Sequence, residues 1–106
     1  MIKSLKNPER RPIHPGAILR EDVLPGLGMN PTNFATHLGI SKTLMTGLLG
    51  EKKSLTVDMA LRISKAVGGS ADSWLSMQLA LDLWEAENYF KNNPDDTPKS
   101  LRKKFI

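Results

Sequence analysis

The sequence contains no cysteine, and this absence excludes several kinds of chemistry at once. Without thiols the chain has no disulfide framework, no thiolate nucleophile and no cysteine-based zinc site. Histidine is scarce as well, since only His14 and His37 occur. His14 precedes a proline at a predicted helix start, and His37 has no carboxylate or second histidine at i+3 or i+4. We therefore expect no metal site.

Motifs typical of enzymes are also missing. The sequence has no phosphate-binding P-loop, no dinucleotide-binding glycine motif and no nucleophile elbow. The adjacent residues Glu21 and Asp22 would project about 100° apart on a helix, so their carboxylates would not face one another as a catalytic pair does. We expect neither an enzymatic activity nor a bound cofactor.

Long apolar runs are absent. Prolines and charges interrupt the first 13 residues, and no stretch approaches the roughly 18 consecutive apolar residues of a membrane span. Neither secretion nor membrane insertion is indicated, so we expect a cytoplasmic protein. Strand-like alternation bounded by hairpin turns is missing too, which favours an all-α fold.

The net charge of +4 invites a nucleic-acid interpretation, but the charge sits mainly at the two ends. Residues 1–13 carry four Lys or Arg and one Glu, and residues 91–106 carry five Lys or Arg and two Asp. Each end therefore contributes +3, which leaves −2 for the middle of the chain. Basicity alone is weak support for a DNA-binding core.

Capping residues and apolar periodicity predict five helices. The residues expected to cap or open them are His14 with Pro15, Asn30 with Pro31, Ser41, Thr56 and Ser70. Pro25 and Gly26 are expected to end the first helix, and the last and longest helix should extend to about residue 90. The predicted organisation is a flexible arm at 1–13, a folded domain at 14–90 and a loose basic tail at 91–106.

The segment 30–50 has the pattern of a helix-turn-helix. Its two helices need a small residue where they approach most closely, which Ala35 supplies, and a glycine at positive φ in the turn, which Gly39 supplies. The remaining framework positions should be apolar, and here they are Phe34, Leu38, Ile40, Met45 and Leu48. All seven positions fit.

In a helix-turn-helix the outward face of the second helix enters the DNA major groove. The residues expected at the groove are Ser41, Lys42, Thr43, Thr46 and Gly47. Thr32 should lie near a phosphate at the start of the first helix, and Lys52 and Lys53 should contact the DNA backbone just beyond the second. Simple solvent exposure remains the alternative for the threonines and for these two lysines.

The string Ala35-Thr36-His37-Leu38-Gly39-Ile40-Ser41 resembles the A-x-x-x-G-[IV]-S segment of the lambda-repressor-like (Xre) family. A narrower resemblance covers roughly residues 14–87 and is to the HigA/VapI-type antitoxins. It is carried by His14-Pro15-Gly16, Ile18-Leu19-Arg20-Glu21, Leu27-Gly28, Leu61-Arg62-Ile63, Trp74-Leu75, Gln78 and Asp82-Leu83-Trp84. It implies a five-helix lambda-repressor-like domain and a homodimeric repressor of its own operon that neutralises a HigB-type toxin, a ribosome-dependent mRNA endonuclease.

The long last helix supports a homodimer independently of the family, because it carries two apolar stripes. One consists of Leu75, Leu79, Leu83, Ala86 and Phe90, and the other of Trp74, Met77, Ala80, Leu81 and Trp84. One stripe can cover the domain's own core, while the other meets a second copy and pairs two recognition helices on a palindromic operator. We assign dimerisation to Trp74, Met77, Leu81 and Trp84. Burial of both stripes within one chain is the alternative.

Two other functions remain open at this stage. The chain could be a stand-alone Xre-type regulator without a toxin partner, or a helical protein-interaction module that has lost DNA binding. A small basic open reading frame immediately upstream would favour the antitoxin over the plain regulator. The sequence does not indicate where a toxin would dock. The basic tail is a poor candidate, because its positive charge would repel a toxin that itself binds RNA.

Overall fold

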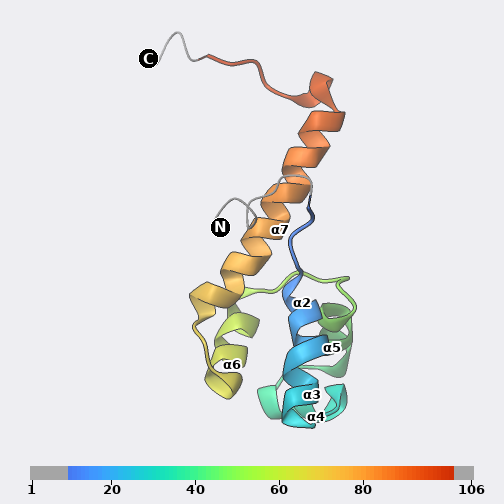
Figure 1. Ribbon diagram of the computed structural model, residues 1–106, viewed down its shortest axis with the longest axis vertical. Helices are drawn as coiled ribbons and strands as arrows, with labels where there is room; N and C mark the ends of the chain where they lie inside the picture. Colours follow the sequence, from blue (N-terminus) through green and yellow to red (C-terminus); the bar gives the residue numbers. More distant parts are fainter. Residues whose placement is uncertain (1–9, 102–106) are drawn as a thin grey trace.

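The computed structural model describes residues 10–101, which are helical and contain no strand (Figure 1). This confirms the predicted all-α, five-helix fold. The elements are α2 (Pro15–Ile18), the π-helical segment η1 (Leu19–Val23), α3 (Leu24–Leu27), α4 (Pro31–Leu38), α5 (Lys42–Leu49), α6 (Val57–Val67), α7 (Ala71–Asn92) and the 3-10 turn η2 (Pro94–Asp96). The first three elements follow one another without a break and form the first of the five helices.

The predicted N-caps are confirmed. Asn30 Oδ1 accepts a hydrogen bond from Asn33 N at 2.8 Å, and Ser41 Oγ accepts one from Leu44 N at 3.0 Å. Thr56 and Ser70 cap α6 and α7 in the same way. Each cap satisfies an amide that has no partner inside its helix, which fixes where the helix begins.

The first helix does not end at Pro25, contrary to the prediction. It passes through the wider π-helical turn of η1 and continues as α3 to Leu27, ending at Gly28 with φ of 66°. Proline cannot donate a backbone hydrogen bond, and π-type turns commonly occur where the regular helical ladder is interrupted. The rearranged turn therefore carries the helix past Pro25 instead of ending it.

The core lies between the first helix, α4, α5 and α6, with the first half of α7 packed against it. The largest fully buried side chains are those of Pro15, Leu19, Phe34, Met45, Leu48, Ile63 and Leu81. Trp74 and Gln78 of α7 are buried as well. The second half of α7 projects away from the other helices (Figure 1).

Two of the four residues assigned to dimerisation belong to the monomer's own interior. Trp74 is 8 % exposed and Leu81 2 % exposed, while Met77 and Trp84 are half-buried. Trp74 also donates from Nε1 to Gly68 O at 3.4 Å, across the turn between α6 and α7. The assignment of Trp74 and Leu81 to a dimer interface was therefore wrong, because the domain needs this stripe of α7 to close its core.

The other stripe of α7 faces solvent. Leu79 is 59 % exposed, Leu83 52 % and Phe90 44 %, and Ala86 between them is also exposed. We refer to these four residues as the exposed stripe. Leu75, the first residue of the predicted set, is half-buried against the core. The helical projection separates the two stripes, and burial shows that the stripe with Trp74 and Leu81 faces the core while the exposed stripe faces solvent.

The predicted arm and tail lie partly outside the described residues, at 1–9 and 102–106. Of the arm, Arg11 is bound to the domain, with Nη1 3.3 Å from Glu51 Oε1 and Nη2 3.6 Å from Glu85 Oε2. The folded unit thus begins before His14. Within residues 10–101, no helix is long and apolar enough to cross a membrane.

Candidate DNA-binding surface

The turn between α4 and α5 is a tight glycine turn. Gly39 has φ of 76°, a conformation that strains other residue types. Its N–H binds Thr36 O at 3.1 Å, and the N–H of Ile40 binds Ala35 O at 3.1 Å. This is the Schellman arrangement that ends helices at a left-handed residue. Only three residues therefore lie between the end of α4 and the start of α5.

The framework positions pack as the helix-turn-helix pattern predicts. Phe34, Ala35 and Leu38 of α4 are buried, as are Met45 and Leu48 of α5, and Ile40 is half-buried. Ala35 is only 2 % exposed, so its small side chain lies inside the domain. α5 is therefore held by its inner face and presents its outer face to solvent.

Four of the residues predicted to face the groove lie on this outer surface. Lys42, Thr43 and Thr46 are exposed on α5, and Ser41 is exposed at its N-cap. The hydroxyl of Ser41 already accepts from Leu44 N, which leaves its O–H to donate and one lone pair to accept. Thr32 is exposed at the start of α4. Their contacts with DNA remain a prediction.

Gly47, Lys52 and Lys53 form one local surface just past the exposed face of α5. Both lysines are exposed, and their amides bind Gly47 O at 2.8 Å and 3.1 Å. The side chain of Lys53 lies across Gly47, where an added Cβ would fall 2.8 Å from Lys53 Cδ. Gly47 is therefore half-buried beneath Lys53 and does not offer a bare backbone to a groove.

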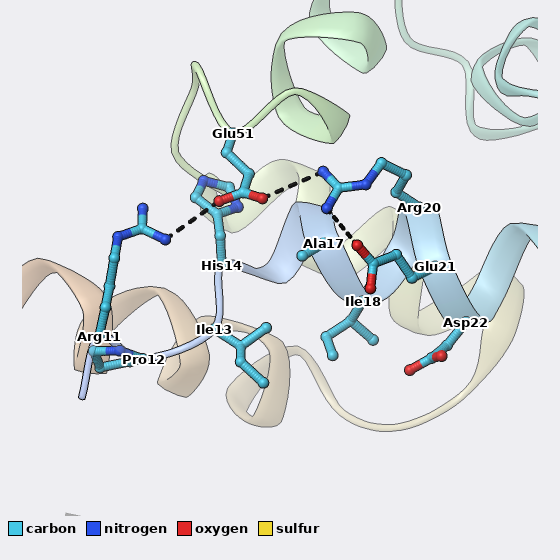
Figure 2. Close-up of a pocket in the computed structure, with 10 residues that line it drawn as sticks. All are labelled: Arg11, Pro12, Ile13, His14, Ala17, Ile18, Arg20, Glu21, Asp22 and Glu51. Atoms are coloured by element: carbon cyan, nitrogen blue, oxygen red, sulfur yellow. Dashed lines mark hydrogen bonds and ion pairs between the residues drawn. The ribbon is translucent and has the colours of Figure 1, made fainter. Parts of the chain in front are cut away.

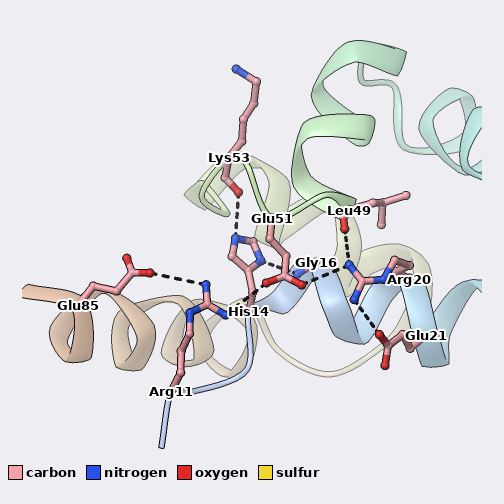
Figure 3. Close-up of polar contacts among 9 residues, drawn as sticks. All are labelled: Arg11, His14, Gly16, Arg20, Glu21, Leu49, Glu51, Lys53 and Glu85. Carbon is pink, nitrogen blue, oxygen red and sulfur yellow. Dashed lines mark hydrogen bonds and ion pairs between the residues drawn. The ribbon is translucent and has the colours of Figure 1, made fainter. Parts of the chain in front are cut away.

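His14 and Gly16 hold the first helix against the carboxyl end of α5 (Figure 3). The N–H of Gly16 donates to His14 Nδ1 at 2.8 Å, so Nε2 carries the ring proton and donates to Lys53 O at 3.1 Å. The bond from Gly16 confirms the capping role of His14, and an exposed fraction of 4 % makes His14 an interior residue. The His-Pro-Gly string thus joins the start of the first helix to the loop that follows α5.

Arg20 supports the same end of α5. Its Nη1 donates to Leu49 O at 2.7 Å and lies 3.2 Å from Glu51 Oε2, while Nη2 lies 2.7 Å from Glu21 Oε2. Arg11 adds a second partner for Glu51, so that a chain of ion pairs extends from Glu85 to Glu21 (Figure 3). No motif in the sequence indicated this chain, because its members come from four separate segments.

Glu51 has a perturbed carboxyl group and an unusual backbone conformation. Partial burial by itself would raise its pKa, but hydrogen bonds from Arg20 and Arg11 outweigh burial and hold the pKa below its ordinary value. Its φ of 61° is in the left-handed region that other residues than glycine seldom adopt. The two arginines bind this residue where the chain leaves α5.

Arg62 of α6 contacts the other end of the motif. Its Nη1 donates to Leu38 O at 2.8 Å, and its Nε donates to Asp58 Oδ2 at 2.9 Å. An added Cβ on Gly39 would fall 2.9 Å from the same Nη1. In the sequence Arg62 stands out only as part of a resemblance, because a side chain that binds a backbone carbonyl 24 residues away leaves no local pattern.

An open groove of about 400 Å³ runs between residues 11–13 and the first helix (Figure 2). Arg20 lies between the carboxylates of Glu51 and Glu21 at its wall, and Arg11 also pairs with Glu51, so two arginines balance the charges of two glutamates. Across residues 10–101, no three His, Asp or Glu side chains are grouped to hold a metal ion.

Comparison with known proteins gives related sequences and structures, although no family model matches. The chain is 43 % identical over 75 residues to virulence-associated protein I of Dichelobacter nodosus. The match covers 71 % of this chain and 69 % of that protein. Antitoxin GraA in complex with its operator shares 34 % identity at a TM-score of 0.76, covering 87 % of this chain and 93 % of GraA.

Pseudomonas aeruginosa antitoxin HigA, solved with the higBA promoter, shares 28 % identity at a TM-score of 0.77 and covers 86 % of this chain and 99 % of HigA. Relatives of this chain are named as antitoxins and HTH-type transcriptional regulators, which are not enzymes, so the expectation of a non-enzyme is confirmed. The predicted resemblance is confirmed as well. The chain belongs to the HigA-like antitoxins and regulators of the Xre helix-turn-helix family.

Proposed function

We propose that this chain binds operator DNA as a homodimer, represses its own operon and neutralises a HigB-type toxin. The observation that carries the DNA-binding part is the outer face of α5, with Lys42, Thr43 and Thr46 exposed on a rigidly held helix. Short side chains of this kind allow the helix to approach base edges closely, and Lys42 can reach a guanine or a phosphate. Related antitoxins have been solved on their own operator or promoter DNA.

The homodimer is supported by the exposed stripe of α7. Leu79, Leu83, Ala86 and Phe90 recur at helical spacing on one side of the helix, and part of this row lies on the half that projects from the domain. An extended apolar row on a free helix is costly in water unless a partner covers it. A second copy would bring an identical row, and a two-fold arrangement would present two recognition helices to a palindrome.

Toxin neutralisation rests on family membership. The toxin expected is a HigB-type mRNA interferase. An antitoxin that binds both this enzyme and the operator of its own operon acts in the cytoplasm. We assign no docking site on this chain to the toxin. Among residues 10–101 the exposed charges of α7 are mainly acidic, at Asp72, Asp82, Glu85 and Glu87, which suits a basic RNA-binding partner.

Binding to the chain's own promoter fragment, measured by fluorescence anisotropy, tests the DNA-binding part. A clear preference over a scrambled fragment is expected, and no binding at low salt would favour a protein-interaction module. Co-expression with the open reading frame upstream tests the toxin part. Rescue of growth and co-purification are expected, whereas a harmless upstream product would leave a stand-alone regulator.

A further inference from the structure

Each helix of the helix-turn-helix receives an arginine from another helix at its carboxyl end. At the end of α4, Arg62 of α6 donates to Leu38 O at 2.8 Å. At the end of α5, Arg20 of the first helix donates to Leu49 O at 2.7 Å. The two contacts span 24 and 29 residues of sequence, so they connect the motif to the two helices that flank it.

The carboxyl end of a helix is a suitable place for a guanidinium. The last carbonyls of a helix lack intrahelical donors and carry partial negative charge. Each arginine is also oriented by carboxylates, Arg62 by Asp58 at 2.9 Å, and Arg20 by Glu51 at 3.2 Å and Glu21 at 2.7 Å. A planar guanidinium with two partners has a defined orientation, which lysine cannot reproduce.

The position of Arg62 connects it to the geometry that DNA recognition requires. Its Nη1 also approaches Gly39 O, at 3.5 Å, so it lies against the turn that sets the angle between α4 and α5. A small change in this angle would move Thr43 and Thr46 relative to base edges without unfolding the domain. Arg20 fixes the opposite end of α5 against the first helix.

We infer that Arg62 and Arg20 are positioning residues for operator recognition, which act through the helix ends and do not themselves bind phosphate. This inference rests on the proposed DNA-binding function. It predicts that loss of either arginine reduces the affinity for the operator more than the affinity for unrelated DNA. The number of phosphate contacts should stay the same.

The test measures dissociation constants for operator and scrambled DNA over a range of salt concentrations, with the full chain and the variants Arg62→Ala, Arg62→Lys and Arg20→Ala. Both alanine variants should bind the operator about tenfold more weakly and lose selectivity. The slope of log Kd against log salt should not change, because no phosphate contact is lost. Arg62→Lys should restore only part of the affinity.

Lys65→Ala is the matched control, since it removes one positive charge from the exposed side of α6. It should leave selectivity as in the parent. If Arg62→Ala does not fold, Asp58→Asn replaces it, because this change releases the guanidinium from its orienting carboxylate. Asp58→Asn also makes the chain more basic, so a selective loss of operator binding would oppose the electrostatic effect and support the inference.

Three results would overturn the inference. A salt slope that falls by about one in Arg62→Ala or Arg20→Ala would identify that arginine as a phosphate contact. Full recovery in Arg62→Lys would show that only charge matters, and unchanged selectivity in both alanine variants would show that neither positions α5. Failure of the parent chain itself to prefer its operator would instead contradict the proposed function, so the two failures are distinguishable.

Discussion

Gly16 of the first helix packs against the carbonyl group of Leu48 in α5, so closely that an added Cβ would lie 1.9 Å from the carbonyl oxygen. No pair of nonbonded heavy atoms tolerates this distance, and the obstacle is backbone that cannot rotate away. Gly16 therefore allows the first helix to approach α5. This contact gives a physical reason for the third residue of the His-Pro-Gly string.

Gly16→Ala should destabilise the domain strongly, by at least about 2 kcal/mol, because the first helix must move off α5. Chemical denaturation followed by circular dichroism measures this change in the free energy of unfolding. Gly26→Ala is the control, since nothing lies within 4 Å of its added Cβ. It should be neutral or stabilising by up to about 1 kcal/mol. Equal stabilities for the two variants would contradict the packing described.

The ion pairs of Glu51 should make stability depend on pH in the acid range. A carboxyl pKa held below its ordinary value of 4.5 contributes stability that is present above that value and is lost as pH falls through the lower, folded pKa. Glu51→Gln should therefore be less stable than the parent near pH 7, with the difference shrinking below about pH 4. Thermal unfolding from pH 3 to pH 7 measures this. A difference that stays constant to pH 3 would contradict the account.

The sequence was sufficient to predict the caps and the helix-turn-helix but not the contacts that join distant segments. Asn30, Ser41, Thr56 and Ser70 could be identified because capping depends on residues within one turn. The bond from His14 to Lys53 O depends on how the helices fold back, and 39 residues separate the two. Capping chemistry therefore predicted that His14 opens a helix, but not its position in the interior.

The two apolar stripes of α7 show a different limit. Helical periodicity places Leu79 and Leu83 on one side and Trp74 and Leu81 on the other, but it does not say which side faces the core. Dimerisation was expected for the stripe that contains Trp74, whereas the domain uses Trp74 to cover the turn after α6. The choice depends on the shape left open by the other helices, which no local pattern encodes.

Leu83→Asp should disrupt the proposed homodimer without unfolding the chain. A charge in the middle of an exposed apolar row costs little in the monomer but much in an apolar interface. Sedimentation at tens of micromolar should show a dimer for the parent and a monomer for this variant. Leu61→Asp is the control, because Leu61 is 46 % exposed on α6 and is not part of the exposed stripe. A strictly monomeric parent would contradict the dimer.

Leu81→Ala should lower the free energy of unfolding without directly changing the oligomeric state. Leu81 is 2 % exposed, and truncation of a buried leucine typically costs about 2–5 kcal/mol. The free energy of unfolding should fall by this amount, measured under conditions where the parent and the variant have the same oligomeric state. A loss below about 1 kcal/mol would return Leu81 to the list of candidate interface residues.

The central claim is that the exposed face of α5 recognises DNA, and Lys42 is its one charged member. Anisotropy titrations of the native chain and Lys42→Ala against the chain's own promoter fragment and a scrambled fragment, over a range of salt concentrations, test it most directly. The account predicts that the parent prefers its promoter and that Lys42→Ala binds the promoter more weakly. If Lys42 contacts a base, the variant should also lose selectivity. If Lys42 contacts a phosphate, the slope of log Kd against log salt should be smaller by about one. Equal binding of both fragments by the parent, or identical titrations for parent and variant, would contradict it.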